Sequence, residues 1–332
     1  MSENRPKVVV TRRVYGEALA VLEADCRVEN LARGGTDDPA PRPLDEDGLA
    51  AALWDAEGLL CQLTDLVTAR VLAAAPRLRV VSQIAVGVDN IDVEEATRRG
   101  IAVTNTPGVL TEATADLAFA LLLATARRLP EAERFLRAGR WRTWEIDLLA
   151  GASVHGKTLG IVGFGRIGRA VARRARGFSM EVLCWSRSLS AGTAEEGALA
   201  VPLERLLEES DFVSLHLPLS PRTRHAIGEA ELSRMRPHAI LVNTARGPIV
   251  DERALIAALR ERRIAGAGLD VFEDEPRVSP ELLAMENVVL LPHIGSATVE
   301  TRRLMCEMAA SDCRAVLFGE RPRHPVNPEV LR

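Results

Sequence analysis

Short apolar runs alternate along the chain with segments in which apolar residues recur at helical spacing. The runs that predict strands are 7–11, 58–63, 79–84 and 100–106, followed by 158–165, 180–186, 211–218, 239–245, 266–272 and 287–293. Segments between the early runs, at 14–24, 45–55, 66–75 and 92–98, have the spacing of amphipathic helices. Nearly continuous apolar strands between such helices are typical of parallel sheets covered on both faces. The pattern therefore predicts an α/β fold with two doubly wound parallel-sheet domains, Rossmann-like or flavodoxin-like.

Length and charge agree with two globular domains. The chain has 332 residues, and a domain takes ~150 residues. Its formal net charge of −4 gives no reason to expect nucleic acid or a membrane surface as a partner. The longest apolar run, 117–126, is far shorter than the ~20 residues that a bilayer span needs. It predicts a buried helix, in a core or at a subunit interface, and the polar segment 30–44 predicts a surface loop.

The cysteines and the N-terminus point to a reducing compartment. The five cysteines are scattered and form no CxxC pair; they are Cys26, Cys61, Cys184, Cys306 and Cys313. This spacing favours neither a metal site nor a disulfide framework. The first residues, "MSENRPKVVV", contain no long apolar stretch, so no signal peptide is expected. We therefore expect no metal and a cytoplasmic location.

A glycine-rich turn lies at the end of the strand run predicted at 158–165, where the apolar residues stop at Gly163. Its residues are Gly163, Gly165, Arg166, Ile167 and Gly168, in the order G-F-G-R-I-G, and a helical pattern begins directly after them. Glycines at these positions allow a tight turn, a close approach to a pyrophosphate and close packing of helix on strand. The free N–H groups at the helix N-terminus can then bind phosphate. The order of strand, turn and helix predicts a dinucleotide site.

The next strand ends in the sequence "WSRS", where an acidic residue would bind the ribose hydroxyls of NAD. Ser186, Arg187 and Ser188 occupy that position instead. An arginine flanked by two hydroxyls suits a 2′-phosphate, through charge-assisted hydrogen bonds of roughly 1.5–3 kcal/mol each. We therefore expect NADP(H) to be preferred. The alternative is that Arg187 points to water and NAD(H) is also used.

Three later strands end in polar side chains that could share one site. Arg246 follows the strand 239–245, Asp270 and Glu275 follow the next strand, and His293 follows the last. Ligands of open parallel sheets bind outside the carboxyl ends of the strands. Each residue alone has an ordinary alternative: an ion pair for Arg246, a solvated carboxylate for Glu275 and a buried histidine for His293. Their shared placement after a dinucleotide turn favours catalysis.

The sequence resembles the D-isomer-specific 2-hydroxyacid dehydrogenases, and among them the glyoxylate/hydroxypyruvate reductases. The motifs that carry the resemblance are "AVGVDNID" (85–92), "NTPGVLTEATADLAFALLL" (105–123), "GKTLGIVGFGRIG" (156–168), "LVNTARGPIVDERAL" (241–255), "AGLDVFEDEP" (267–276) and "LPHIGSAT" (291–298). The resemblance implies a substrate domain split between residues 1–102 and 297–332. An NAD(P)-binding Rossmann domain, residues 103–296, is inserted into it.

The resemblance also implies roles for individual residues. Arg246 binds the substrate carboxylate and carbonyl, His293 donates the proton, and Glu275 pairs with His293. The backbone of Val86 and Gly87, with the side chain of Leu63, completes the substrate site. Besides the residues of the glycine turn and of "WSRS", the implied cofactor site contains Thr114, Pro218, Thr244, Ala245, Asp270, His293 and Gly295.

The activity expected from the resemblance is NADPH-preferring reduction of glyoxylate and hydroxypyruvate to glycolate and D-glycerate. The alternatives are another D-2-hydroxyacid dehydrogenase, such as a 2-ketogluconate reductase or a phosphoglycerate-type enzyme, and a phosphite dehydrogenase. A non-enzymatic NAD(H)-sensing corepressor is disfavoured by the short chain end and by the arginine at the ribose. A homodimer is expected through the helix "ADLAFALLLATARRL" (115–129), with Leu148 in the segment that would reach the partner. Which 2-oxo acid is the physiological substrate stays open.

Overall fold

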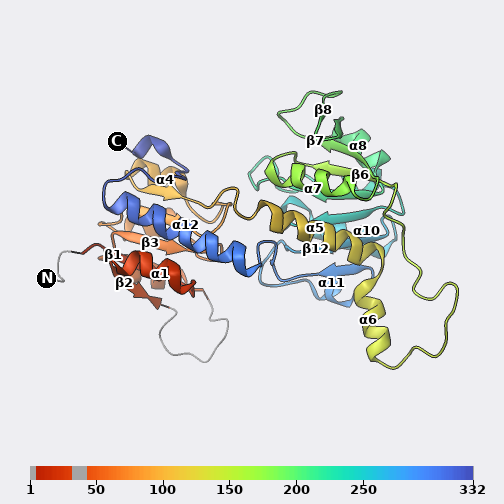
Figure 1. Ribbon diagram of the computed structural model, residues 1–332, viewed down its shortest axis with the longest axis horizontal. Coiled ribbons are helices and arrows are strands. Elements are labelled where there is room, and N and C mark those ends of the chain that lie inside the picture. The colour runs from red at the N-terminus through yellow and green to blue at the C-terminus, as the bar shows by residue number, and fades with distance from the viewer. Residues whose placement is uncertain (1–4, 32–42, 332) are drawn as a thin grey trace. The chain divides into compact units, whose positions relative to one another are not determined.

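The computed structural model describes residues 5–31 and 43–331, and the chain forms two compact units (Figure 1). One unit contains residues 1–110 and 297–332, and the other contains residues 111–296. The first division falls later than the boundary predicted after residue 102. The reason is that β5 (Ala102–Thr104) pairs in parallel with β4 (Val80–Gln83), so the predicted boundary would cut the first sheet at its edge.

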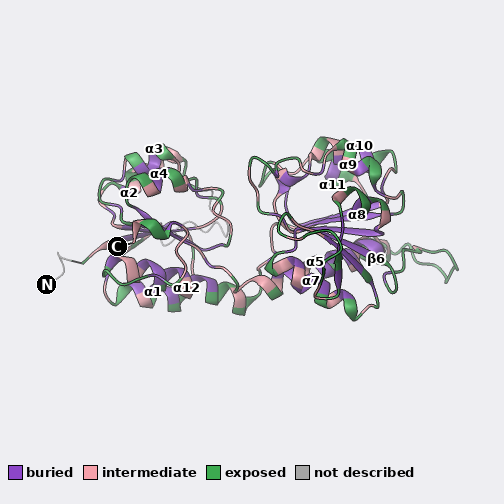
Figure 2. Cartoon of the chain, turned by 90° about the horizontal axis from the view of Figure 1, so that it is seen from above, coloured by how far each residue is buried: buried purple, intermediate pink, exposed green. Residues whose placement is uncertain are grey.

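The first unit is a five-stranded parallel sheet between two layers of helices. The strand order is β2-β1-β3-β4-β5, with β1 at Lys7–Val10, β2 at Arg27–Asn30 and β3 at Gly58–Cys61. The helices α1 (Gly16–Glu23) and α12 (Val299–Leu317) cover one face (Figure 2). The other face is covered by α2 (Glu46–Leu53), α3 (Ala69–Ala73) and α4 (Val93–Arg98). The C-terminal turn η3 (Pro328–Val330) belongs to the same unit.

The second unit is an eight-stranded sheet in the order β13-β12-β11-β10-β6-β7-β9-β8, parallel except for the pair of β8 and β9. Its strands are β6 (Thr158–Val162), β7 (Glu181–Trp185), β8 (Ala194–Glu195), β9 (Ala198–Ala200), β10 (Phe212–Leu215), β11 (Ile240–Asn243), β12 (Gly266–Leu269) and β13 (Val288–Leu290). The chain leaves β6 toward β7 on one side and later returns to β10 on the other. This reversal is the topological switch point at which ligands of such sheets bind.

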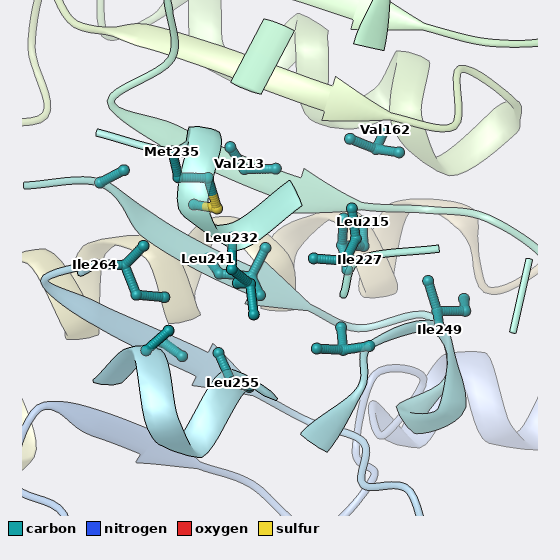
Figure 3. Packing of buried hydrophobic residues seen from close by; sticks show 14 of the residues in the cluster. Val162, Val213, Leu215, Ile227, Leu232, Met235, Leu241, Ile249, Leu255 and Ile264 are labelled. Atoms are coloured by element: carbon teal, nitrogen blue, oxygen red, sulfur yellow. The ribbon is translucent and has the colours of Figure 1, made fainter. Parts of the chain in front are cut away.

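Helices cover both faces of the second sheet as well. The helices α5 (Thr111–Ala126) and α7 (Arg166–Arg176) pack on one face. The other face carries α8 (Leu203–Glu209), α9 (Glu229–Arg234), α10 (Glu252–Arg260), α11 (Pro280–Ala284) and the short turn η2 (Gly247–Ile249). Figure 3 shows part of the apolar cluster between the sheet and this second set of helices. In it, Val213 and Leu241 of the strands lie beside Leu232 of α9. The expected α/β fold with two doubly wound sheets is confirmed.

The structure also bears on the cysteines, the longest apolar run and the surface loop predicted from the sequence. All five cysteines are buried and free. The run 117–126 lies in α5, whose apolar residues pack in the core of the second unit. Most of the predicted surface loop, residues 32–42, lies outside the described residues. Among the described residues, no helix is both long enough and apolar enough to cross a membrane.

Candidate active site

The glycine turn joins β6 to α7, and its three glycines have different surroundings. Gly163 has a φ of 99°, and a Cβ there would lie 2.6 Å from the backbone of His216. A Cβ on Gly168 would lie 2.2 Å from the carbonyl oxygen of Gly163. A Cβ on Gly165 would meet no atom within 4 Å. Gly163 and Gly168 are therefore required by packing, whereas Gly165 leaves the backbone open toward a ligand.

Two further observations fit a dinucleotide at this turn. The helix α7 begins at Arg166 with Gly165 as its N-cap, and no side chain caps it. Its first N–H groups, including those of Arg166 and Ile167, are therefore available to phosphate. At the end of β11, the hydroxyl oxygen of Thr244 is buried and has no hydrogen-bond partner among the described residues. A buried polar atom of this kind needs a partner, and a bound nicotinamide dinucleotide would supply one.

The segment after β7, where the sequence predicts the 2′-phosphate contact, carries two serine hydroxyls and an exposed arginine. The hydroxyl oxygens of Ser186 and Ser188 lie 3.0 Å apart, and the Ser188 N–H donates to the Ser186 hydroxyl at 3.3 Å. Arg187 is exposed. Within the described ranges, no ion pair or hydrogen bond engages the Arg187 side chain. The guanidinium is thus available to an anionic ligand.

Asp270 holds the turn that carries His293. The Asp270 carboxylate is fully buried and accepts hydrogen bonds from the N–H groups of Ile294 and Gly295, each at 2.7 Å. Burial raises the pKa of Asp270 more strongly than these hydrogen bonds lower it. The His293 N–H donates to the Asp270 carbonyl oxygen at 2.9 Å, and His293 has a left-handed φ of 52°.

Thr114 lies beside the same turn. A Cβ on Gly295 would lie 3.2 Å from an Asp270 carboxylate oxygen and 3.7 Å from the Thr114 hydroxyl oxygen. Three of the predicted cofactor residues are therefore neighbours, although they come from α5, from the end of β12 and from the loop after β13. Pro218 and Ala245 are placed farther along the same edge of the sheet, after β10 and β11.

His293 and Glu275 form a hydrogen-bonded pair. The His293 Nδ1 atom lies 2.7 Å from a Glu275 carboxylate oxygen, and the other carboxylate oxygen accepts from the Phe272 N–H at 2.9 Å. The side chains are 30% and 32% exposed. An Nδ1–H held by a carboxylate orients the ring and fixes its tautomer, while Nε2 stays available for proton transfer.

Arg246 lies on a rigid turn after β11. Asn243 holds this turn at both ends, because its amide donates to the Arg246 carbonyl oxygen at 2.9 Å and its oxygen accepts from the Ala245 N–H at 3.0 Å. The Arg246 guanidinium donates to the Ala245 carbonyl oxygen at 2.9 Å. A Cβ on Gly247 would lie 1.8 Å from the Phe272 carbonyl oxygen. The turn of Arg246 is thus packed against the loop that leads to Glu275.

The candidate substrate residues of the first unit follow β3 and β4. Leu63 lies two residues after β3 and is half-buried, and Val86 and Gly87 lie in the loop after β4. Both segments leave the carboxyl edge of the first sheet. Asn105, which the sequence did not single out, donates its amide to the Val86 carbonyl oxygen at 2.7 Å.

Sequence reasoning missed Asn243 and Asn105, and also the buried Gln83. A signal was present for two of them: "ILVN" and "VVSQ" are apolar strands that each end in an amide side chain. A polar residue at the end of a buried strand has to find hydrogen-bond partners in the following loop. No comparable signal marks Asn105.

Comparisons with known proteins identify the family of the chain. Residues 119–295 match the family described as D-isomer specific 2-hydroxyacid dehydrogenase, NAD binding domain. The chain is 50% identical to a glyoxylate reductase of Thermococcus litoralis, with 98% of each chain covered. It is 52% identical to a glyoxylate reductase of Korarchaeum cryptofilum, with 99% of this chain and 98% of the relative covered.

Solved structures lead to the same family. An NADPH-dependent glyoxylate/hydroxypyruvate reductase from Sinorhizobium meliloti, in complex with NADP and malonate, is 35% identical with a TM-score of 0.86, and 99% of both chains is covered. A glyoxylate reductase structure from Paecilomyes thermophila is 32% identical with a TM-score of 0.85, covering 98% of this chain and 99% of that one. The protein therefore belongs to the D-isomer-specific 2-hydroxyacid dehydrogenase family and is an NAD(P)-dependent oxidoreductase.

Proposed function

We propose that the enzyme reduces glyoxylate and hydroxypyruvate to glycolate and D-glycerate and prefers NADPH to NADH. The observation that carries the proposal is the 2.7 Å contact between His293 and Glu275 at the carboxyl edge of the second sheet. It supplies an oriented proton donor on the edge where the glycine turn lies. The names of the relatives, glyoxylate reductase and glyoxylate/hydroxypyruvate reductase, support this substrate class.

The residues of the chain divide the work of the proposed reaction. The guanidinium of Arg246 binds the substrate carboxylate and carbonyl oxygen, for which its planar fork is suited. When bound, the reduced cofactor supplies a hydride to the carbonyl carbon. His293 donates the proton from Nε2 to the carbonyl oxygen, which becomes the hydroxyl of the product. Glu275 accepts from Nδ1 and holds the His293 ring in the orientation that the proton transfer needs.

The cofactor is held by the second unit in this proposal. The backbone around Gly165 and the N-terminus of α7 bind the pyrophosphate, and Arg187 with its two serines binds the 2′-phosphate. Thr244 offers its hydroxyl, which has no partner among the described residues. The other proposed cofactor residues line the nicotinamide and adenosine sides: Thr114, Pro218, Ala245, Asp270 and Gly295. The first unit is the substrate domain and contributes Leu63 and the N–H groups of Val86 and Gly87.

We also propose that two copies of the chain pair through the second unit. The α5 helix is less available for this than its composition suggests, because eight of its residues are buried in its own unit. Helix α6 (Leu129–Arg137) has no buried residue. The segment 138–153 that follows exposes Trp141, Trp144 and Ile146. The free apolar surface therefore lies on α6 and this segment, which includes Leu148.

The proposed reaction is tested by following NADPH oxidation with glyoxylate, hydroxypyruvate and 2-ketogluconate, and NADP⁺ reduction with phosphite. His293→Gln should lower kcat on glyoxylate by about 10²–10⁴, the range for losing a positioned general acid. Glu275→Gln should lower it as well, because a neutral amide holds the His293 ring less firmly than a carboxylate does.

The chain offers a matched control at the opposite edge of the same sheet. His238 Nε2 lies 2.8 Å from an Asp211 carboxylate oxygen, in a second histidine–carboxylate pair. His238→Gln should therefore keep the turnover of the wild type. The proposal is wrong if wild-type protein does not oxidise NADPH with glyoxylate, or if His293→Gln and His238→Gln have the same kcat.

A further inference from the structure

Three consecutive carbonyl groups in the loop after β4 each accept a hydrogen bond from the first unit. The Ala85 carbonyl oxygen accepts from the Thr106 N–H at 2.9 Å. The Val86 carbonyl oxygen accepts from the Asn105 side-chain amide at 2.7 Å. The Gly87 carbonyl oxygen accepts from the Gln83 side-chain amide at 3.3 Å. Two of the three donors belong to the segment directly after β5, the strand next to β4.

Because the peptide bond is planar, a hydrogen bond that holds a carbonyl group also fixes the direction of the next N–H group. In a trans peptide, the carbonyl of one residue and the N–H of the next point in opposite directions. Holding the Ala85 carbonyl therefore fixes the direction of the Val86 N–H. In the same way, Asn105 fixes the direction of the Gly87 N–H through the Val86 carbonyl. The two N–H groups then point away from the donors that hold the loop.

These two N–H groups have no internal acceptor. Within the described parts of the chain, neither the Val86 N–H nor the Gly87 N–H donates a hydrogen bond. Val86 is exposed and Gly87 is half-buried, so water or a ligand can reach them. Adjacent free N–H groups form a small site for an anion such as a carboxylate.

A polar network behind the loop makes the arrangement stiff. The Gln83 amide also donates to the Asn90 side-chain oxygen at 2.7 Å. The Asn90 amide donates to the carbonyl oxygens of Asp65 at 2.7 Å and of Gln62 at 3.2 Å. Gln83 is fully buried, so its side chain has no access to water as a substitute partner. The Gly87 end of the loop is therefore tied into the unit, and the peptide between Val86 and Gly87 depends on Asn105.

We propose that Asn105 is a positioning residue for the substrate carboxylate. It acts through the Val86 carbonyl and aims the Gly87 N–H at the carboxylate of the 2-oxo acid. The proposal rests on the proposed function, in which the N–H groups of Val86 and Gly87 bind that carboxylate. Without Asn105, the peptide can rotate and present its carbonyl oxygen to the substrate, which repels a carboxylate.

Asn105→Ala should raise the KM for glyoxylate about tenfold, the lower end of what one charge-assisted hydrogen bond contributes. The kcat at saturating glyoxylate and the KM for NADPH should stay close to wild type, since neither the proton donor nor the cofactor site changes. Asn105→Gln keeps an amide donor on a longer stem and should recover part of the affinity.

Asn287→Ala is the matched control. The Asn287 amide donates to the Ala265 carbonyl oxygen at 3.1 Å in the other unit, so this variant also loses an amide-to-backbone bond. It should lower the melting temperature to a similar extent and leave the KM for glyoxylate unchanged. An Asn105→Ala enzyme with the wild-type KM overturns the inference. The inference is also overturned if Asn105→Ala lowers both kcat and the melting temperature and Asn105→Gln restores neither. That result would mean that Asn105 has only a structural role.

Binding of oxamate, an analogue with the same carboxylate, separates this inference from the proposed reaction. Calorimetry of wild-type protein and of Asn105→Ala should show about tenfold weaker oxamate binding in the variant. If wild-type protein binds oxamate but reduces no glyoxylate, the proposed reaction is wrong and the oxamate comparison still decides on Asn105. Equal oxamate affinity in the two proteins, or no oxamate binding by wild type, overturns the inference.

Discussion

Arg187 is the residue that, in the proposed function, distinguishes NADPH from NADH. It follows β7, carries a positive charge, and is flanked by two serine hydroxyls that lie within hydrogen-bond distance of each other. No carboxylate stands between β7 and Glu195 in the sequence. A 2′-phosphate would therefore meet one guanidinium and two hydroxyls, while the ribose hydroxyls of NADH would meet no charged acceptor.

Arg187→Ala should lower kcat/KM for NADPH about tenfold and leave the value for NADH nearly unchanged. One or two charge-assisted hydrogen bonds contribute about 1.5–3 kcal/mol, and the exposure of Arg187 argues for the lower end because water screens the charge. The measurement is kcat/KM for both cofactors at saturating glyoxylate.

Two companion variants sharpen this test. Ser186→Asp should invert the preference, because a carboxylate accepts from ribose hydroxyls and repels a phosphate. Arg205→Ala removes an exposed arginine that pairs with Glu209 on α8, and it should change neither value. If Arg187→Ala lowers the NADH and NADPH values by the same factor, Arg187 has a structural role and the predicted NADPH preference loses its basis.

The sequence located these residues by their place after strands, and it could not show what holds them. Arg246, Asp270 and His293 are polar residues just beyond apolar runs, a pattern visible in one dimension. The contacts of Asn243 and Asn105 depend on loop conformations that bring a side chain to a carbonyl a few or many residues away. The left-handed φ of His293 also has no sequence signal; it occurs in the turn whose N–H groups at Ile294 and Gly295 donate to Asp270.

At the scale of elements, the six-residue turn between β6 and α7 contains glycines with two different roles, one in packing and one in ligand binding. Gly163 and Gly168 face protein backbone at distances that exclude a Cβ, whereas Gly165 faces open space. The Gly165 backbone is extended, with a φ of −83°, so an alanine can adopt the same conformation. The motif therefore contains two positions required for packing and one that is free to contact a ligand.

Gly165→Ala should fold with nearly wild-type stability and bind NADPH more weakly, because the added methyl group occupies the space of the pyrophosphate. Gly163→Ala should lower the free energy of unfolding by about 1–3 kcal/mol from left-handed backbone strain alone, with a further cost from the clash at His216. Urea unfolding and NADPH fluorescence titration measure the two effects. Equal losses of stability in both variants would contradict this division of roles.

The pattern of apolar residues predicted ten strands, and each predicted run contains one, usually shorter than the run by one to three residues at its ends. The strands that were not predicted are β2, β8 and β9. β2 and β8 are edge strands of their sheets: β2 has the sequence "RVEN" with alternating exposure, and β8 has two residues. β9 lies between β7 and β8, but it has only three residues, and the middle one is exposed. An edge strand needs no continuous apolar run, so hydrophobic periodicity does not distinguish it from a loop.

At the scale of the whole molecule, each unit has a complete core of its own, with apolar clusters on both faces of each sheet. Large apolar side chains that stay exposed outside these cores are therefore not needed for the fold of either unit, and such side chains often mark a binding surface. Trp144 is 71% exposed and Ile146 is 82% exposed, and both lie in the segment after α6, a helix with no buried residue. A second copy of the chain is the partner that we propose for this surface.

Wild-type protein should have a light-scattering mass of twice 36.0 kDa at assay concentrations. The double variant Trp144→Glu, Ile146→Glu should have the mass of one chain, because two carboxylates would have to lose water to enter an apolar interface. Trp54→Glu is the control: Trp54 is 68% exposed but lies in the other unit, at the end of α2, and the variant should stay dimeric. Thermal unfolding of the double variant should also lose the dependence on protein concentration that an associating protein shows. A wild-type protein with the mass of one chain, or a double variant that stays dimeric, would show that this surface has a different role.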